Sequence, residues 1–130
     1  MTDHLTLVDV RDYWDEMKPG LEWTRQKIGA PWRPEDVYAA CLSGSAFVYS
    51  GETGFVVVQP KTDPFNGKPE LFVWIAFAFD GLNNIERFQS SVDRLAQDFG
   101  FEKLTMWTNR PGFEKVPGWT QVSAVYERVL

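Results

Sequence analysis

The residues that could carry chemistry in this chain follow one apolar segment. The segment "LFVWIAFAF" runs from Leu71 to Phe79 and leads through Asp80 and Gly81 into "LNNIERFQ". Apolar residues on both faces predict a central strand, and the residues after Gly81 predict the start of a helix. Strand-to-helix turns often bind phosphate groups, because free backbone N–H groups and the positive end of the helix dipole point outward there. The turn is therefore a cofactor site, a degenerate cofactor site or a simple connector.

Other kinds of site find little support in the sequence. The single histidine, His4, has no cysteine or second histidine at ligand spacing, so no metal site is predicted. Cys41 stands near the expected C-terminal end of a helix, where the dipole does not lower a thiol pKa, and we predict a packed, unreactive thiol. The chain has no Gly-x-Ser-x-Gly elbow and no Gly-x-x-x-x-Gly-Lys loop. Hydrolase and nucleotidase chemistry therefore lack their usual motifs.

The composition is that of one globular domain, residues 1–130. Six Trp and ten Phe exclude a disordered chain. The longest apolar run is far shorter than the roughly twenty residues of a membrane span, and the N-terminus does not resemble a signal peptide. One cysteine allows no internal disulfide, so we expect a cytoplasmic protein. The net charge of −5, with scattered Lys and Arg, argues against a nucleic-acid partner, and no membrane partner is expected.

Three helical segments are predicted in the first third of the chain, after a short strand over His4–Val8. Asp9 can cap the first helix, and Pro19 with Gly20 is expected to end it. The stretch "LEWTRQKI" offers a second helical piece. Pro34 begins a third helix in "PEDVYAACL", where two acidic residues complement the helix dipole.

The middle of the chain changes to a period of two residues, which is typical of strands. "SAFVYS" and "GFVVVQP" predict a hairpin with its turn near Gly51–Gly54. The central strand Leu71–Phe79 should have Gly54–Gln59 as an antiparallel neighbour and Lys103–Thr108 as a parallel one. Because this strand is apolar on both faces, helices must cover both faces of the sheet.

A long helix and a last strand complete the prediction. Ile85, Phe88, Val92, Leu95 and Phe99 repeat at helical spacing, and Asn83 with Glu86 matches a capping box. The C-terminal stretch "WTQVSAVYERVL" is rich in β-branched and aromatic residues and predicts a strand.

The order of these elements resembles the GNAT (Gcn5-related N-acetyltransferase) fold over nearly the whole chain. The likeness is most pointed in the C-terminal half, where Asn109 ends a hydrophobic strand and Gly118-Trp119 enters the last one. The run "PWRPEDVYAACLSGSAFV" is also similar to small GNAT-like proteins of bacteriophages and prophages, which would add a virion-associated location. The resemblance implies an α/β fold with a GNAT-like mixed central sheet and helices on both faces.

The resemblance also implies where a cofactor would bind. In that family acetyl-CoA lies between two splayed strands, its pantetheine pairs with the central strand, and a Gln/Arg-x-x-Gly-x-Gly/Ala turn holds its pyrophosphate. Carried over, the cofactor-binding residues are Trp74, Ala76, Asp80, Gly81, Leu82, Asn83, Asn84 and Asn109. Glu70 would be the catalytic general base, because family members often place a carboxylate on or beside this strand. A solvated strand-end acid is the alternative reading of Glu70.

The sequence departs from the family at the turn. It has one glycine instead of two, and Asp80 stands where a base is expected, so phosphates should be repelled there. Asp80 can instead serve as a turn or capping residue. The segment "RPGFEKVP" lacks the Tyr with which the family protonates the leaving thiolate. Trp74 and Trp107 either line a cleft between the splayed strands or fill the core.

Two functions are consistent with these observations. The first is an interaction or structural protein, phage-derived, with a degenerate pyrophosphate turn that binds no cofactor or binds it weakly. Its surplus of aromatic residues predicts a protein partner or a homo-oligomer. The alternative is an acyl-CoA-dependent N-acyltransferase that uses acetyl-CoA or another acyl-CoA and an acceptor that the sequence does not define.

Overall fold

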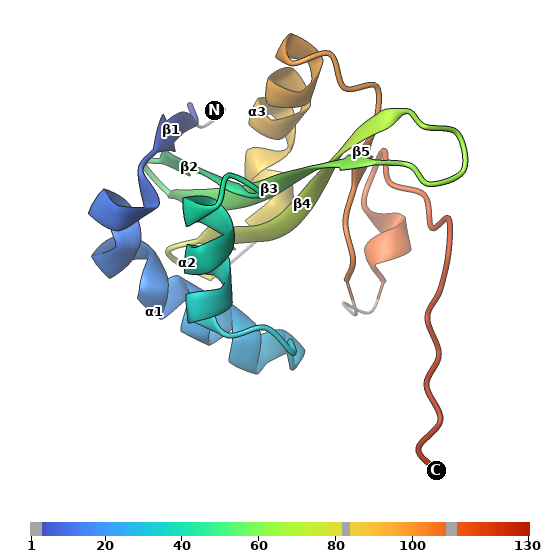
Figure 1. Cartoon of the computed structure of the whole chain (residues 1–130), viewed down its shortest axis with the longest axis horizontal. Coiled ribbons are helices and arrows are strands. Elements are labelled where there is room, and N and C mark those ends of the chain that lie inside the picture. Colours follow the sequence, from blue (N-terminus) through green and yellow to red (C-terminus); the bar gives the residue numbers. More distant parts are fainter. Residues whose placement is uncertain (1–3, 82–83, 109–111) are drawn as a thin grey trace.

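The computed structural model of the chain describes residues 4–81, 84–108 and 112–130. A five-stranded sheet with the order β1-β2-β3-β4-β5 forms its centre (Figure 1). The strands are β1 (Thr6–Val8), β2 (Phe47–Gly51), β3 (Gly54–Thr62), β4 (Pro69–Ala78) and β5 (Leu104–Thr105). The helices are α1 (Val10–Ile28), α2 (Pro34–Leu42), α3 (Asn84–Asp98) and the short 3-10 helix η1 (Phe113–Lys115).

The position of β4 confirms the predicted arrangement of the sheet. It pairs with β3 in antiparallel orientation and with β5 in parallel orientation. The predicted hairpin is also present, because β2 and β3 pair from Phe47–Val58 to Gly51–Gly54. The fold is therefore α/β with a mixed central sheet, as the sequence predicts. No helix among the described residues is long and apolar enough to cross a membrane.

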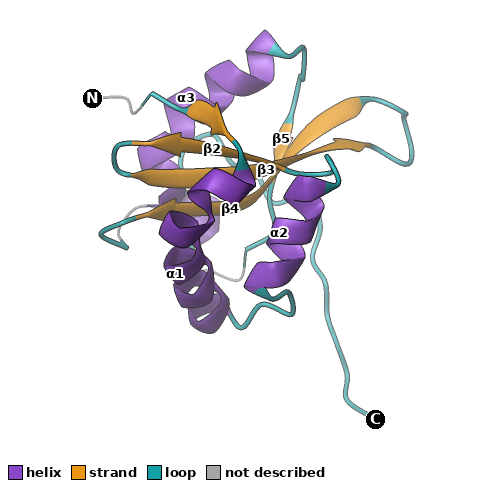
Figure 2. Cartoon of the chain, turned by 60° about the vertical axis from the view of Figure 1, so that its left-hand side comes forward, coloured by secondary structure: helices purple, strands orange, loops and turns teal. Residues whose placement is uncertain are grey.

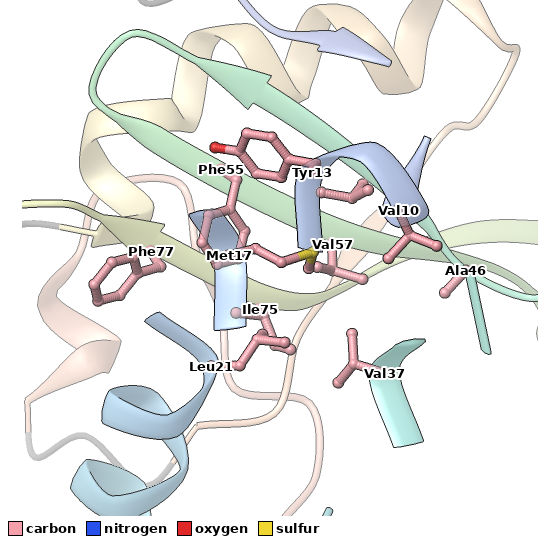
Figure 3. Close-up of a cluster of buried hydrophobic side chains, with 11 residues drawn as sticks. Val10, Tyr13, Met17, Leu21, Val37, Ala46, Phe55, Val57, Ile75 and Phe77 are labelled. Carbon is pink, nitrogen blue, oxygen red and sulfur yellow. The ribbon is translucent and has the colours of Figure 1, made fainter. Parts of the chain in front are cut away.

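Helices lie on both faces of the sheet (Figures 1 and 2), and an apolar cluster lies on each face. In the first cluster α1 and α2 cover one face, and Figure 3 shows their side chains pointing toward those of β3 and β4. This cluster includes Val10, Tyr13, Met17, Leu21, Val37, Phe55, Val57, Ile75 and Phe77. In the second cluster α3 covers the other face with Ile85, Phe88 and Val92. Both faces of the sheet are thus covered by helices, as expected.

The helix α1 is longer than the sequence predicts. The expected break at Pro19 and Gly20 is wrong, because the helix continues to Ile28 and is closed by Gly29 in the left-handed conformation. Gly20 packs against the ring of Phe77, and a Cβ atom there would lie 2.6 Å from Phe77 Cδ2. Met17 and Leu21, on either side of the proline, are fully buried. The apolar burial on this face offsets the single hydrogen bond that the proline removes.

The predicted last strand is wrong as well. Residues 120–130 pair with no described strand, and both views show them leading away from the body of the protein (Figures 1 and 2). The neighbouring strand β5 is also shorter than expected, since only Leu104 and Thr105 pair with β4. High β propensity alone does not make a strand, because a strand also needs hydrogen bonds to a partner edge.

The predicted apolar face of α3 is confirmed except at the C-terminal end of the helix. Its last residue is Asp98, so Phe99 lies outside the helix and is mostly exposed. Asn83, one half of the predicted capping box, lies outside the described residues.

Gly54 should be essential for the packing of β3 on β4. It pairs with Ala78, and a Cβ atom at this position would collide with the backbone carbonyl oxygen of Phe77. The paired backbones of β3 and β4 cannot move apart to relieve this collision. We therefore expect Gly54→Ala to lower the free energy of unfolding by about 2–4 kcal/mol in urea titrations. Ser50→Ala on β2 is the control and should change it by less than about 1 kcal/mol. Equal effects of the two substitutions would contradict this packing.

Candidate active site

The strand β4 is interrupted by a β-bulge at Trp74. Val57 pairs with Ile75 and Val58 pairs with Val73, so Trp74 has no partner on β3. As a result Trp74 and Ile75 both pack on the α1 and α2 side, although they are consecutive residues. A bulge of this kind bends the strand and re-aims its side chains. The second half of β4 therefore runs in a different direction from the first half.

Beyond the bulge, one edge of β4 is open. β5 pairs only with Leu71 and Phe72, and no strand of the described residues pairs with Val73–Phe77 on that side. Figure 1 shows the chain after β5 descending away from β4. An open strand edge presents N–H and C=O groups that can pair with an extended ligand. Trp74 and Ala76, two predicted cofactor-binding residues, lie on this open stretch and are half-buried.

A tight turn connects the open stretch to α3. The N–H of Gly81 donates to the carbonyl oxygen of Ala78 (2.7 Å), and Gly81 has a φ of 74°. Its α-carbon packs beside the ring of Trp23, since a Cβ atom there would lie 3.4 Å from Trp23 Cζ2. Glycine adopts this left-handed conformation without steric cost. The turn thus brings β4 close to the N-terminal end of α3, which begins at Asn84.

Asp80 is not an isolated charge in this turn. Its Oδ2 atom lies 2.8 Å from Nη2 of Arg87, which projects from the first turns of α3. The sequence predicted that Asp80 repels phosphates, but the guanidinium group offsets that charge at contact distance. An anion at this turn would therefore meet a nearly neutral ion pair and the positive end of a helix.

Glu70 lies at the start of β4, away from the open stretch. Its Oε2 atom is 3.7 Å from Nζ of Lys103, and the same ammonium group lies 3.3 Å from Oδ2 of Asp63. The backbone N–H of Phe65 donates to Asp63 and is the main cause of the lowered pKa of that carboxyl group. Along the strand, four residues correspond to about 13 Å between Glu70 and Trp74. Glu70 therefore belongs to a cluster of three charged residues that lies apart from the turn between β4 and α3.

An aromatic surface lies between Glu70 and the bulge. The rings of Phe72 and Trp107 meet edge to face at 5.5 Å, and Nζ of Lys61 lies 4.2 Å from the centre of the Phe72 ring. Trp107 is 79% exposed, whereas Trp74 packs against Trp32 at 6.1 Å in the first core cluster. The two tryptophans that the sequence analysis grouped together thus lie in different environments.

The structure brings only some of the predicted residues together. Trp74, Ala76, Asp80, Gly81 and Asn84 follow one another from the open edge of β4 to the start of α3. Leu82, Asn83 and Asn109 lie outside the described residues, and Glu70 stands apart. In the part of the chain that the structure describes, no three His, Cys, Asp or Glu side chains gather as metal ligands would.

Sequence reasoning missed Arg87 and Lys61. A basic residue in the first turns of the helix that follows the acidic turn was a usable signal for Arg87. Lys61 gave no such signal, because its contact with Phe72 depends on the register of β3 against β4.

Comparison with solved structures defines the class of fold. The chain aligns over 98% of its length with the ribosomal-protein-alanine N-acetyltransferase of Brucella melitensis biovar Abortus 2308, covering 99% of that protein at 15% identity and a TM-score of 0.70. It aligns equally far with a Trypanosoma brucei acetyltransferase, covering 99% of it at 11% identity and a TM-score of 0.62.

A third solved structure extends this comparison. It is an aminoglycoside acetyltransferase from an uncultured soil metagenomic sample, in complex with sisomicin. The chain covers 96% of that protein at 9% identity and a TM-score of 0.65. No family model and no curated protein sequence matches the chain. The chain therefore has a GNAT-like fold, and its structural neighbours are acetyltransferases.

Cys41 lies on α2 beside the first core cluster, away from the β4 turn. Burial raises the pKa of its thiol to about 11. Because the thiolate is the reactive form, we expect its rate of reaction with a disulfide reagent to keep rising about tenfold per pH unit from pH 7 to 9.5. The control is the exposed Ser123→Cys in a Cys41→Ser chain, whose rate should level off above a pKa of about 8.5. A rate that levels off at the same pH for Cys41 would contradict the buried thiol.

Proposed function

We propose that this protein is an acyl-CoA-dependent N-acyltransferase. The observation that carries the proposal is the open edge of β4, which starts at the Trp74 bulge and ends at the N-terminus of α3. The acetyltransferases that share its fold make acyl transfer the first chemistry to test. This proposal takes the alternative reading of the sequence over the non-catalytic one.

The residues of the open edge fit the chemical character of the donor. Pantetheine contains amide groups, and on the side away from β3 the backbone of Val73–Phe77 offers N–H donors and C=O acceptors that pair with no strand of the described residues. The start of α3 supplies positive potential for phosphates, and Arg87 supplies the base that Asp80 does not. A bound acyl-CoA would provide the acyl group in activated form as a thioester.

Glu70 is the residue that we assign to proton transfer. Its carboxylate, which lies 3.7 Å from Nζ of Lys103, is the group that would accept a proton from an acceptor amine. Because about 13 Å separates Glu70 from the bulge, the proton would have to pass along a chain of several water molecules. The segment 110–117 contains no tyrosine, so we assign no side chain to protonation of the leaving thiolate.

The second candidate function is an interaction or structural protein that keeps the fold without the chemistry. The single glycine of the turn favours it, because a second glycine would let the backbone approach a pyrophosphate more closely. It differs from the first candidate in one measurable property, the affinity for acyl-CoA.

Calorimetric titration with acetyl-CoA separates the two candidates. We expect a dissociation constant of about 10–100 µM. Asp80→Asn should tighten binding roughly three- to tenfold, because it frees Arg87 for phosphate, and Arg87→Gln should weaken it by a similar factor. Both effects should shrink as salt is raised. No heat of binding up to millimolar acetyl-CoA would instead support the interaction protein.

The assignment of Glu70 is tested with a matched control. Sisomicin and a peptide with N-terminal alanine are suitable first acceptors, because two structural neighbours are named for such amines. With the acceptor on which the unmodified chain releases CoA fastest, we expect Glu70→Gln to lower kcat at least about 100-fold without changing acetyl-CoA affinity. Asp63→Asn, which alters the other partner of Lys103, should leave kcat within about threefold. Equal losses in both variants would refute the role of Glu70.

A further inference from the structure

Three side chains beside the first half of β4 form what we call the lysine–aromatic surface: Lys61, Phe72 and Trp107. Nζ of Lys61 lies 4.2 Å from the centre of the Phe72 ring and 5.4 Å from the centre of the Trp107 ring. The two rings meet edge to face at 5.5 Å. Phe72 is buried, whereas Lys61 and Trp107 are exposed. A ligand at this surface would therefore contact an ammonium group and a tryptophan ring.

The lysine–aromatic surface lies on the same face of the sheet as α1 and α2. Leu71 and Val73 pack in the cluster under α3, so Phe72, which lies between them on β4, points to the opposite face. Lys61 on β3 pairs in register with Glu70 and reaches diagonally to Phe72 on that face. Figures 1 and 2 show the β3–β4 hairpin extending beyond α1 and α2. The surface is thus accessible where the helices end.

The ammonium group of Lys61 determines which kind of ligand fits. It forms no ion pair with an acid of the described residues, because Glu70, its partner across the strands, pairs with Lys103. Two aromatic rings alone could bind a cation, but Lys61 already lies against them and would repel a second ammonium group. A carboxylate would instead form a charge-assisted hydrogen bond with Lys61, and a flat ring could stack on Trp107. The surface therefore suits an aromatic group that carries a negative charge.

The lysine–aromatic surface also lies close to the Trp74 bulge. Phe72 and Trp74 are two residues apart, which corresponds to roughly 7 Å along a strand. The bulge begins the open edge of β4, where the acyl donor binds in the proposed function. A ligand whose carboxylate lies at Lys61 reaches this edge with an amine only when the two groups stand at opposite ends of the molecule. 4-(Aminomethyl)benzoate has this form, with one ring between its amine and its carboxylate.

We propose that the lysine–aromatic surface is the acceptor site of this protein, and that the acceptor is a primary amine with an aromatic ring and a carboxylate at its far end. This inference rests on the acyl transfer proposed above. The neutral amine would form a C–N bond to the thioester carbonyl carbon as the C–S bond breaks, and the proton that the nitrogen loses would end on the thiol of CoA. Lys61 and Trp107 position the acceptor and touch no reacting atom.

Calorimetric titration with two amines, with and without CoA, tests the site. We expect 4-(aminomethyl)benzoate to bind at least about tenfold more tightly than benzylamine, which lacks the carboxylate. Lys61→Met, which keeps an apolar stem over Phe72, should remove this difference, and Lys61→Arg should retain it.

Lys27→Met is the matched control for the titrations. Nζ of Lys27 also lies near a tryptophan ring, 5.9 Å from the centre of Trp23, but on α1 and away from the lysine–aromatic surface. This variant should therefore keep the preference for the carboxylate. Equal affinities of the unmodified chain for the two amines, or equal losses in Lys61→Met and Lys27→Met, would overturn the proposal.

Release of CoA separates this inference from the function on which it rests. With acetyl-CoA as the donor, Lys61→Met should raise the KM for 4-(aminomethyl)benzoate at least about tenfold, while kcat and the affinity for acetyl-CoA stay within about threefold. Benzylamine acetylated as efficiently as 4-(aminomethyl)benzoate by the unmodified chain would overturn the acceptor class and leave the acyltransferase standing. A chain that binds no acetyl-CoA would refute the acyltransferase itself, even if Lys61 binds the carboxylate in the titrations.

Discussion

The bulge at Trp74 is the feature on which the rest of the structure depends. It lies in β4, which alone among the described strands has a parallel neighbour on one side and an antiparallel neighbour on the other. Before the bulge, Leu71 and Phe72 pair with β5, and beyond it Ile75 and Phe77 pack under α1. With one extra residue at the bulge, β4 pairs with β5 along its first residues and leaves the same edge unpaired along its last ones.

The ion pairs around β4 contribute little to the stability of the fold. Their main effect is to fix where two charged groups lie. Arg87 pairs with Asp80 at the turn, and Lys103 pairs with both Glu70 and Asp63 at the other end of β4. Ion pairs with at least one partly exposed member typically contribute roughly 0–1 kcal/mol to stability. Their effect is to place a guanidinium group beside the start of α3 and a carboxylate at the start of β4. In the proposed acyl transfer, Arg87 would bind the phosphates and Glu70 would act as the base from a distance.

The sequence predicted those elements that a single local pattern defines. The period of two residues indicated the β2–β3 hairpin, and the apolar repeat of Ile85, Phe88 and Val92 indicated α3. The bulge could not be predicted from the sequence. A bulge shifts the alternation of apolar and polar residues along a strand, and a strand that is apolar on both faces has no such alternation. The continuation of α1 through Pro19 depends on a contact between Gly20 and Phe77, which are far apart in sequence. For residues 120–130, β propensity was visible in the sequence, but whether they pair with another strand was not.

The central claim is that the open edge of β4 binds acyl-CoA along its backbone. Hydrogen exchange followed by mass spectrometry, with and without saturating acetyl-CoA, tests it most directly, because pairing with a ligand protects backbone amides. The account predicts slower exchange in the peptides that cover residues 73–78 and the start of α3, with β1 and β2 unchanged. Unchanged exchange in β4, or protection confined to another part of the chain, would contradict it.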